Sequence, residues 1–173
     1  MELFSLLLII SIFTHCVRTI YEILKHKNII NPENKILFSI IFSNMALLWI
    51  SWFGLCFTDP NKINLNPLFK YLGAVFLIFG MILFALSLAK IKRFENYHGD
   101  LITTGIYKYI RHPMYLSFIF WLAGGSLFNQ SVIALLLTLF YTANILVWKK
   151  FEEIHLLNTF PKYKEYIKST YGI

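Results

Sequence analysis

The sequence predicts an all-α protein, a polytopic membrane helical bundle with about five transmembrane helices. Two observations carry this prediction. First, 57% of the residues are hydrophobic and only 14% are charged, whereas a soluble domain carries roughly a quarter charged residues. Second, the apolar residues collect in long runs that short basic segments separate. The length of 173 residues then fits a single integral membrane domain, residues 1–173.

Three apolar runs of the N-terminal half are each long enough to cross a hydrocarbon core of roughly 30 Å at about 1.5 Å per residue. They cover residues 3–24, 36–57 and 68–91. Two further runs, 114–128 and 131–148, are shorter, and only two polar residues separate them. We predict that these two runs form a tight helical hairpin that does not fully reach the far surface.

The third run carries small residues at a regular spacing. Gly73, Gly80 and Ser87 recur every seven residues, so they share one face of a helix. Small residues on one face let helix backbones approach closely in a membrane. The spacing therefore predicts a packing surface rather than a ligand site.

The distribution of basic residues orients the bundle. They gather in the first loop, in the third loop and in the C-terminal tail, whereas the loop 58–67 holds only Lys62, offset by Asp59. Basic loops remain on the cytoplasmic side. We therefore expect the N-terminus outside and the C-terminus in the cytoplasm, in the plasma or inner membrane of a prokaryote or the endoplasmic reticulum of a eukaryote.

The net charge of +7 does not predict a nucleic-acid partner, because the positive residues lie in these short loops. The two cysteines, Cys16 and Cys56, lie inside apolar runs. That position argues against a structural disulfide and against a metal site.

The first run carries a polar stripe. Ser11, His15, Arg18 and Glu22 follow a 4-3-4 spacing, which places them on one face of a helix. One interpretation is a polar wall that faces an active cavity. The other is a structural ion pair near the cytoplasmic end, in which the Arg18 side chain reaches toward the interface. The sequence favours the structural pair, because nothing in it connects this face to a ligand.

The segment 105–115 is a compact cationic and aromatic cluster next to the membrane, where charged residues are costly and usually functional. Pro113 suits the first position of a helix, because its missing N–H has no intrahelical acceptor there. His112 then lies at the cap, and the free amides of the first turn can receive an anionic group. Arg111 adds a permanent cation, and aromatic faces come from Tyr107, Tyr109 and Tyr115.

Two adjacent glutamates, Glu152 and Glu153, follow the last run. Taken alone, they are typical of a solvated helix that pairs with neighbouring lysines. The tail after them, 154–171, has an amphipathic pattern and predicts a surface helix broken near Pro161. Together, the aromatic faces, the cations and the carboxylates suit S-adenosylmethionine, which carries an adenine, hydroxyls, an amino acid group and a sulfonium.

These motifs resemble a known family. The segments 101–107 and 111–115, followed by the glutamate pair 152–153, resemble the isoprenylcysteine carboxyl methyltransferase family, whose wider group includes membrane phospholipid methyltransferases. The resemblance covers roughly residues 98–166. It divides the single domain into three N-terminal spans, 1–91, and a methyltransferase-like cofactor-binding part, 92–173.

The resemblance implies a set of site residues in a cytoplasmic-side pocket, with a lipid-tailed substrate entering from the bilayer. The cofactor contacts fall on His98, Leu101, Ile102, Gly105, Tyr107, His112, Pro113, Met114, Tyr115 and Glu152. Catalytic roles fall on Arg111, His112 and Glu153. Substrate contacts fall on Trp148 and Lys149.

The chain departs from that family at three places. Relatives have a histidine two residues before the leucine that matches Leu101, where this chain has Gly99 next to His98. Leu116 and Ser117 follow the last tyrosine of the motif, where many relatives have glycine. Finally, the prenylcysteine enzymes have a substrate arginine at the position of Trp148, so we expect a prenylcysteine acid to be a poor acceptor.

The sequence therefore predicts an integral membrane methyltransferase that uses S-adenosylmethionine. The acceptor is lipid-like or prenylated, and either carboxyl O-methylation or amine N-methylation fits. Two alternatives stay open. One is a membrane oxidoreductase of the sterol-reductase type with a nicotinamide cofactor. The other is a non-catalytic lipid-binding membrane protein.

Overall fold

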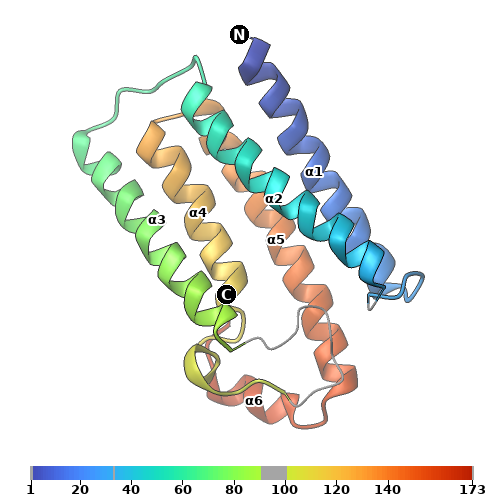
Figure 1. Ribbon diagram of the computed structural model, residues 1–173. Helices are drawn as coiled ribbons and strands as arrows, with labels where there is room; N and C mark the ends of the chain where they lie inside the picture. Colours follow the sequence, from blue (N-terminus) through green and yellow to red (C-terminus); the bar gives the residue numbers. More distant parts are fainter. Residues whose placement is uncertain (1, 33, 91–100, 173) are drawn as a thin grey trace.

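The computed structural model describes residues 2–32, 34–90 and 101–172, and in this part of the chain it is a bundle of helices (Figure 1). The predicted cofactor residue His98 lies outside the described residues. The elements are α1 (Glu2–His26), α2 (Lys35–Thr58), α3 (Pro67–Leu88), the 3₁₀-helix η1 (Gly105–Lys108), α4 (Pro113–Asn129), α5 (Val132–Thr159) and α6 (Tyr163–Ser169).

Four of the described helices, α1, α2, α3 and α5, are long and apolar enough to cross a membrane. Their outward sides carry large exposed apolar residues such as Ile9, Phe57, Val75 and Phe140. In water such a surface would be unfavourable, whereas in a bilayer it faces lipid. The protein is thus an all-α integral membrane bundle, as the composition predicts.

The remaining bundle helix, α4, is the short arm of the predicted hairpin. Its 17 residues extend about 26 Å, less than a typical hydrocarbon core. α4 packs against α2, α3 and α5, and its central residues Phe118, Leu122 and Ser126 are buried. The helix is therefore held by protein on several sides rather than by lipid.

The small-residue stripe of α3 is the contact surface for α4, as predicted. A Cβ atom on Gly73 would lie 2.5 Å from the backbone nitrogen of Phe128, and one on Gly80 would lie 2.6 Å from the Trp121 ring. From the other side, a Cβ on Gly124 would lie 2.9 Å from the Leu77 nitrogen. The close approach of these backbones requires glycine, and α3 and α4 run side by side (Figure 1).

The tight turn between α4 and α5 lies at the same end of the bundle as the connection between α2 and α3, which we call the far end (Figure 1). Gln130 ends α4 in the left-handed conformation, with φ of 52°. The Ser131 hydroxyl caps α5 by accepting from the Ala134 N–H. Asp59 Oδ2 then accepts from the Ser131 hydroxyl at 2.5 Å and from the Ile133 N–H at 2.9 Å, which fixes the turn to the end of α2.

The helices of the C-terminal part of the chain have different boundaries from those predicted. The last span was expected to end at Trp148, with a separate surface helix over 154–171. Instead, α5 continues without interruption to Thr159, and only α6 is a separate helix. Pro161 explains the break, because the residue before a proline is disfavoured in helical conformation, and Phe160 has extended backbone angles. The charged residues after Trp148 therefore lie on α5 itself.

Candidate active site

The end of the bundle opposite the far end contains a cavity of about 620 Å³, which we call the cavity end. Its walls come from α1, α2, α3, η1, α4, α5, the segment after α5 and the chain near residue 101. Nine of the predicted site residues line it, namely Leu101, Ile102, Tyr107, Arg111, His112, Pro113, Met114, Tyr115 and Glu152. Segments from both halves of the chain, from Arg18 of α1 to Tyr166 of α6, therefore meet at one cavity.

Four other predicted site residues do not line this cavity. Gly105 begins η1 with φ of +65°, and the Lys90 side chain packs against it, so this position requires glycine for its backbone conformation. Glu153 and Lys149 lie on α5 behind His112. Trp148 is buried in the hydrophobic core. The structure places these four residues around the site rather than in its wall.

The start of α4 forms one wall of the cavity. Pro113 is the first residue of α4, and His112 is its N-cap, as the sequence predicts. The His112 side chain makes no capping hydrogen bond and instead turns toward α5. Because the first turn of a helix has N–H groups without intrahelical acceptors, this end of α4 offers donors and a positive dipole end to the cavity.

The two glutamates have different surroundings. Glu153 Oε1 lies 3.1 Å from His112 Nε2 and 3.5 Å from Arg111 Nε, while its Oε2 lies 3.5 Å from Lys149 Nζ. Glu152 lines the cavity, and its Oε2 is 3.9 Å from His112 Nδ1. Glu153 thus orients His112 from behind, whereas Glu152 presents its carboxylate to the cavity.

Arg111 fixes the C-terminal segment against the site. Its Nη1 donates to the Ile167 carbonyl at 2.9 Å and to the Thr170 carbonyl at 3.0 Å. Its backbone N–H donates to the Tyr171 carbonyl at 3.0 Å, and the Tyr171 N–H donates to Tyr109 O at 2.9 Å. Arg111 therefore borders the cavity and also holds the chain after α6 in place.

Three tyrosines complete the aromatic part of the site. The Tyr166 hydroxyl donates to the Tyr107 carbonyl at 2.5 Å, and the Tyr163 hydroxyl lies 3.5 Å from His112 Nε2. Burial raises the pKa of Tyr166 to about 12. Burial, with the Glu152 carboxylate nearby, also raises the pKa of Tyr107, and burial with both glutamates raises that of Tyr163. All three are therefore neutral phenols near neutral pH.

Comparison with known protein families identifies the chain. The phospholipid methyltransferase family matches residues 68–163, more than half of the 173 residues. The chain belongs to the phospholipid methyltransferase family. No curated protein and no solved structure matches it. The family match includes every predicted site residue from Leu101 to Glu153, which agrees with the resemblance seen in the motifs.

Membership in the phospholipid methyltransferase family makes the chain a membrane methyltransferase. The match begins at residue 68, so it covers α3, α4 and α5 but neither α1 nor α2. Both of these N-terminal helices nevertheless contribute to the cavity wall. The cavity is thus completed by a part of the chain that the family match does not include.

Sequence reasoning left the contribution of α1 to the cavity as the less favoured of two interpretations of its polar stripe. Arg18, Tyr21 and Lys25 line the cavity, although the polar stripe of this helix was interpreted as a structural ion pair. That pair exists, because Arg18 contacts the Glu22 carboxylate. The 4-3-4 spacing is the signal that marks the stripe. The spacing does not tell which neighbouring helices the stripe faces, and the structure supplies this information.

Trp148 also has an environment that the sequence does not reveal. Its Nε1 donates to Thr19 Oγ1 at 3.1 Å, and its ring stacks beside His15, with 5.7 Å between the ring centroids. The Arg18 guanidinium lies 5.8 Å from its ring centroid. Trp148 therefore joins α5 to α1, and Arg18 lies beside this tryptophan and also lines the cavity.

Proposed function

We propose that the cavity binds S-adenosylmethionine and that the protein transfers the methyl group to a lipid-like acceptor from the bilayer. The observation that carries this proposal is the meeting of His112, Glu152 and the start of α4 with aromatic residues in one cavity. The cavity volume lies within the range of about 300–1,000 Å³ that ligand pockets have. The family match supports methyl transfer over a nicotinamide-dependent reductase.

The residues of the cavity fit the groups of this cofactor. Glu152 can accept hydrogen bonds from ribose hydroxyls or from the ammonium group. The first-turn amides of α4 suit the carboxylate, because a helix N-terminus favours anions. Tyr107 and Tyr115 offer aromatic faces for the adenine and for the sulfonium. When bound, S-adenosylmethionine supplies an electrophilic methyl group on a positively charged sulfur.

The chain's own residues orient the acceptor and exclude water. Trp49, Phe118 and Trp121 line the apolar depth of the cavity, so a reacting group there is shielded from solvent. A carboxylate acceptor needs no general base, whereas an amine acceptor must lose a proton. For an amine, His112 is the group in the wall that takes the proton, and Glu153 at 3.1 Å stabilises the resulting imidazolium.

The orientation with the N-terminus outside and the cavity end in the cytoplasm is part of this proposal. Lys62 is the one basic residue of the segment 59–66 between α2 and α3, and its Nζ donates to the Cys56 carbonyl at 2.8 Å. The opposite end carries Arg111, Lys149 and the lysines around α6. Labelling of single cysteines at Lys62 and Lys164 from the two sides of the membrane checks it, and reaction from the same side would contradict it.

Calorimetry on the full chain in detergent tests the proposed cofactor. We expect binding of S-adenosylmethionine and of its demethylated product S-adenosylhomocysteine, and no binding of reduced nicotinamide nucleotides. Methyl transfer to lipid is followed with a methyl-labelled cofactor and mass spectrometry of lipid extracts. Binding of the nicotinamide nucleotide without binding of the methyl donor would overturn the proposal in favour of the reductase. Binding of neither would favour a lipid-binding protein without catalysis.

A further inference from the structure

We propose that the apolar chain of the acceptor lies in a lateral slot of the cavity, which opens to the bilayer. The slot is the part of the cavity that α2 lines with Phe42, Ala46, Trp49 and Phe53. This inference rests on the proposed function, because it concerns the second substrate of the same cavity. It assigns the selection of the acceptor to a helix that lies outside the residues matched by the family.

The opening is marked by the exposure of the cavity wall. Among the described residues that line the cavity, those that are exposed are Phe42, Ala46 and Phe53. All three belong to α2, which is long and apolar enough to cross a membrane. A wall residue that is also exposed lies at the border between the cavity and the surroundings, which for this helix are lipid. The cavity is therefore open to the bilayer on the α2 side.

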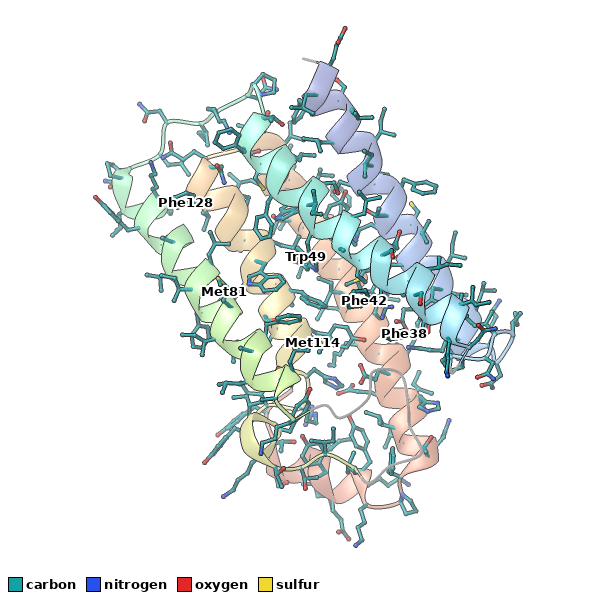
Figure 2. All side chains as sticks on the ribbon, in the orientation of Figure 1. Phe38, Phe42, Trp49, Met81, Met114 and Phe128 are labelled. Carbon is teal, nitrogen blue, oxygen red and sulfur yellow. The ribbon has the colours of Figure 1, made fainter. Side chains whose placement is uncertain are left out.

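The slot follows one face of α2. Phe42, Ala46, Trp49 and Phe53 have a 4-3-4 spacing, so their side chains share one side of the helix. Phe38, Phe42 and Trp49 follow one another along α2 (Figure 2). From residue 42 to residue 53 this face extends about 16 Å. Such a length suits an extended apolar chain rather than a small compact group.

Aromatic rings close the deep end of the slot. Trp49 of α2 and Trp121 of α4 meet edge to face, with 4.9 Å between their ring centroids. Trp121 is held from behind by α3, because a Cβ atom on Gly80 would lie 2.6 Å from its ring. A chain in the slot therefore lies between these rings and the polar end of the cavity, where His112 and Glu152 line the wall.

The neighbouring lateral route, between α3 and α4, is closed. A Cβ atom on Gly73 would lie 2.5 Å from the Phe128 nitrogen, and one on Gly124 would lie 2.9 Å from the Leu77 nitrogen. No lipid chain passes between backbones in such contact. The slot along α2 thus gives the acceptor its way in from the bilayer. The acceptor is an amphiphile whose polar end, which receives the methyl group, lies near His112.

The exposed residues also have a purely structural explanation, in which they are ordinary lipid-facing surface and lipid touches α2 without a site. The two explanations differ in what they predict for binding. Lipid contact with an ordinary surface does not saturate, and it responds alike to a bulky side chain at any exposed position of α2. A slot saturates, and only a residue at its border can block it.

Quenching of tryptophan fluorescence by a brominated lipid tests the slot without methyl transfer, since Trp49 and Trp121 line the cavity. The full chain in nonionic detergent is titrated with dibrominated phosphatidylethanolamine, an amphiphile with an amine at its polar end. We expect a component of the quenching that saturates at low lipid mole fraction and that unbrominated phosphatidylethanolamine displaces. Quenching that only rises in proportion to the lipid, or that the unbrominated lipid does not displace, would overturn the proposal.

Two variants with the same new side chain sharpen this test. Ala46→Phe places a ring at the border of the slot, whereas Ser43→Phe places it at an exposed position of α2 that does not line the cavity. Ala46→Phe should raise the lipid concentration for half-maximal quenching at least about five-fold, because its ring occupies space that the chain needs. Ser43→Phe should leave this concentration unchanged, and Ala46→Leu should give an intermediate value. Equal effects at positions 43 and 46, or none at 46, would overturn the proposal.

Calorimetry separates a failure of the slot from a failure of the proposed function. Affinity for S-adenosylhomocysteine should be equal in the wild type, Ala46→Phe and Ser43→Phe, and melting temperatures verify that all three are folded. A protein that binds this cofactor product without saturable quenching contradicts the slot alone. A protein with saturable, position-dependent quenching that binds no cofactor contradicts the proposed function alone. Loss of cofactor affinity in folded Ala46→Phe would show that residue 46 faces the cofactor, and the proposal would be wrong.

Discussion

Each end of the bundle holds a carboxylate, and the two carboxylates differ in burial and in hydrogen-bond partners, since Asp59 is buried and Glu152 is half-buried. At the far end, Asp59 accepts from Asn61 N, Ser131 Oγ and Ile133 N, and these donors join α2 to the turn before α5. At the cavity end, Glu152 Oε2 lies 3.9 Å from His112 Nδ1, and Glu152 lines the cavity. A carboxylate that accepts hydrogen bonds from the chain's own N–H and O–H groups stabilises the fold. A carboxylate that faces a cavity is available to a ligand.

The largest effect is expected at the far end. Asp59→Ala removes acceptors from three donors, each worth about 1.5–3 kcal/mol when the acceptor is charged, so the protein should lose at least about 3 kcal/mol of stability. Thermal unfolding in detergent, followed by circular dichroism, measures the loss. Asp59→Asn keeps the shape and one oxygen, so it should lose less.

Cofactor affinity of the folded Asp59→Ala protein should be close to that of the wild type, because the change lies at the opposite end from the cavity. A melting temperature equal to the wild-type value would show that the Asp59 carboxylate does not stabilise the far end. A strong loss of cofactor affinity without destabilisation would contradict the separation of the two ends.

An intermediate effect is expected for the carboxylate of the cavity end. Glu152→Gln removes a charged acceptor from the proposed cofactor site, and affinity for S-adenosylmethionine should fall roughly ten-fold or more. The melting temperature of Glu152→Gln should change little, because Glu152 faces the cavity, whereas Asp59 joins α2 to the turn before α5. Calorimetry provides the affinity.

A matched control for this variant is Glu165→Gln, the same chemical change at an exposed position of α6. It should leave cofactor affinity unchanged. If Glu152→Gln binds the cofactor as tightly as Glu165→Gln does, then Glu152 belongs to a solvated helix face and not to the binding site.

The smallest effect is expected for Lys149→Gln. Lys149 lies 3.5 Å from Glu153 Oε2, four residues away on α5, and such partly exposed pairs are worth about 0.2–1 kcal/mol. Because His112 and Arg111 also contact Glu153, cofactor affinity should change less than about three-fold. A larger change, or a selective loss of transfer to a farnesylcysteine acid, would show that Lys149 contacts the substrate.

Much of the fold follows from the sequence because hydrophobicity and small-residue spacing are local signals. The long apolar runs predict α1, α2 and α3, and the spacing of Gly73 and Gly80 predicts the surface that α4 packs against. The end of α5 could not be predicted in the same way. Charged residues after Trp148 suggested the end of a span, but charge does not end a helix, and α5 continues until Pro161 prevents it.

The candidate site, like the fold, could be predicted only in part. The resemblance of the segments 101–107 and 111–115 and of Glu152 to a known family implied that they belong to one pocket, and they line one cavity. Sequence reasoning gave a cavity-facing Arg18 only as the less favoured interpretation, and it did not place Lys25 at the cavity. Helical periodicity tells which residues share a face, but the neighbour of that face depends on how five helices pack, and no local pattern encodes that.

The contacts of Arg111 with the C-terminal segment have an evolutionary consequence. Its guanidinium and its N–H are bound by the carbonyls of Ile167, Thr170 and Tyr171, and a carbonyl is the same in every residue. The side chains at those three positions are therefore free to drift without changing the contact. Gly172 is the exception, since a Cβ there would lie 2.1 Å from Arg111 Nη2. Related chains should thus keep the arginine at position 111 and a small residue at position 172, whereas the side chains at positions 167, 170 and 171 should vary.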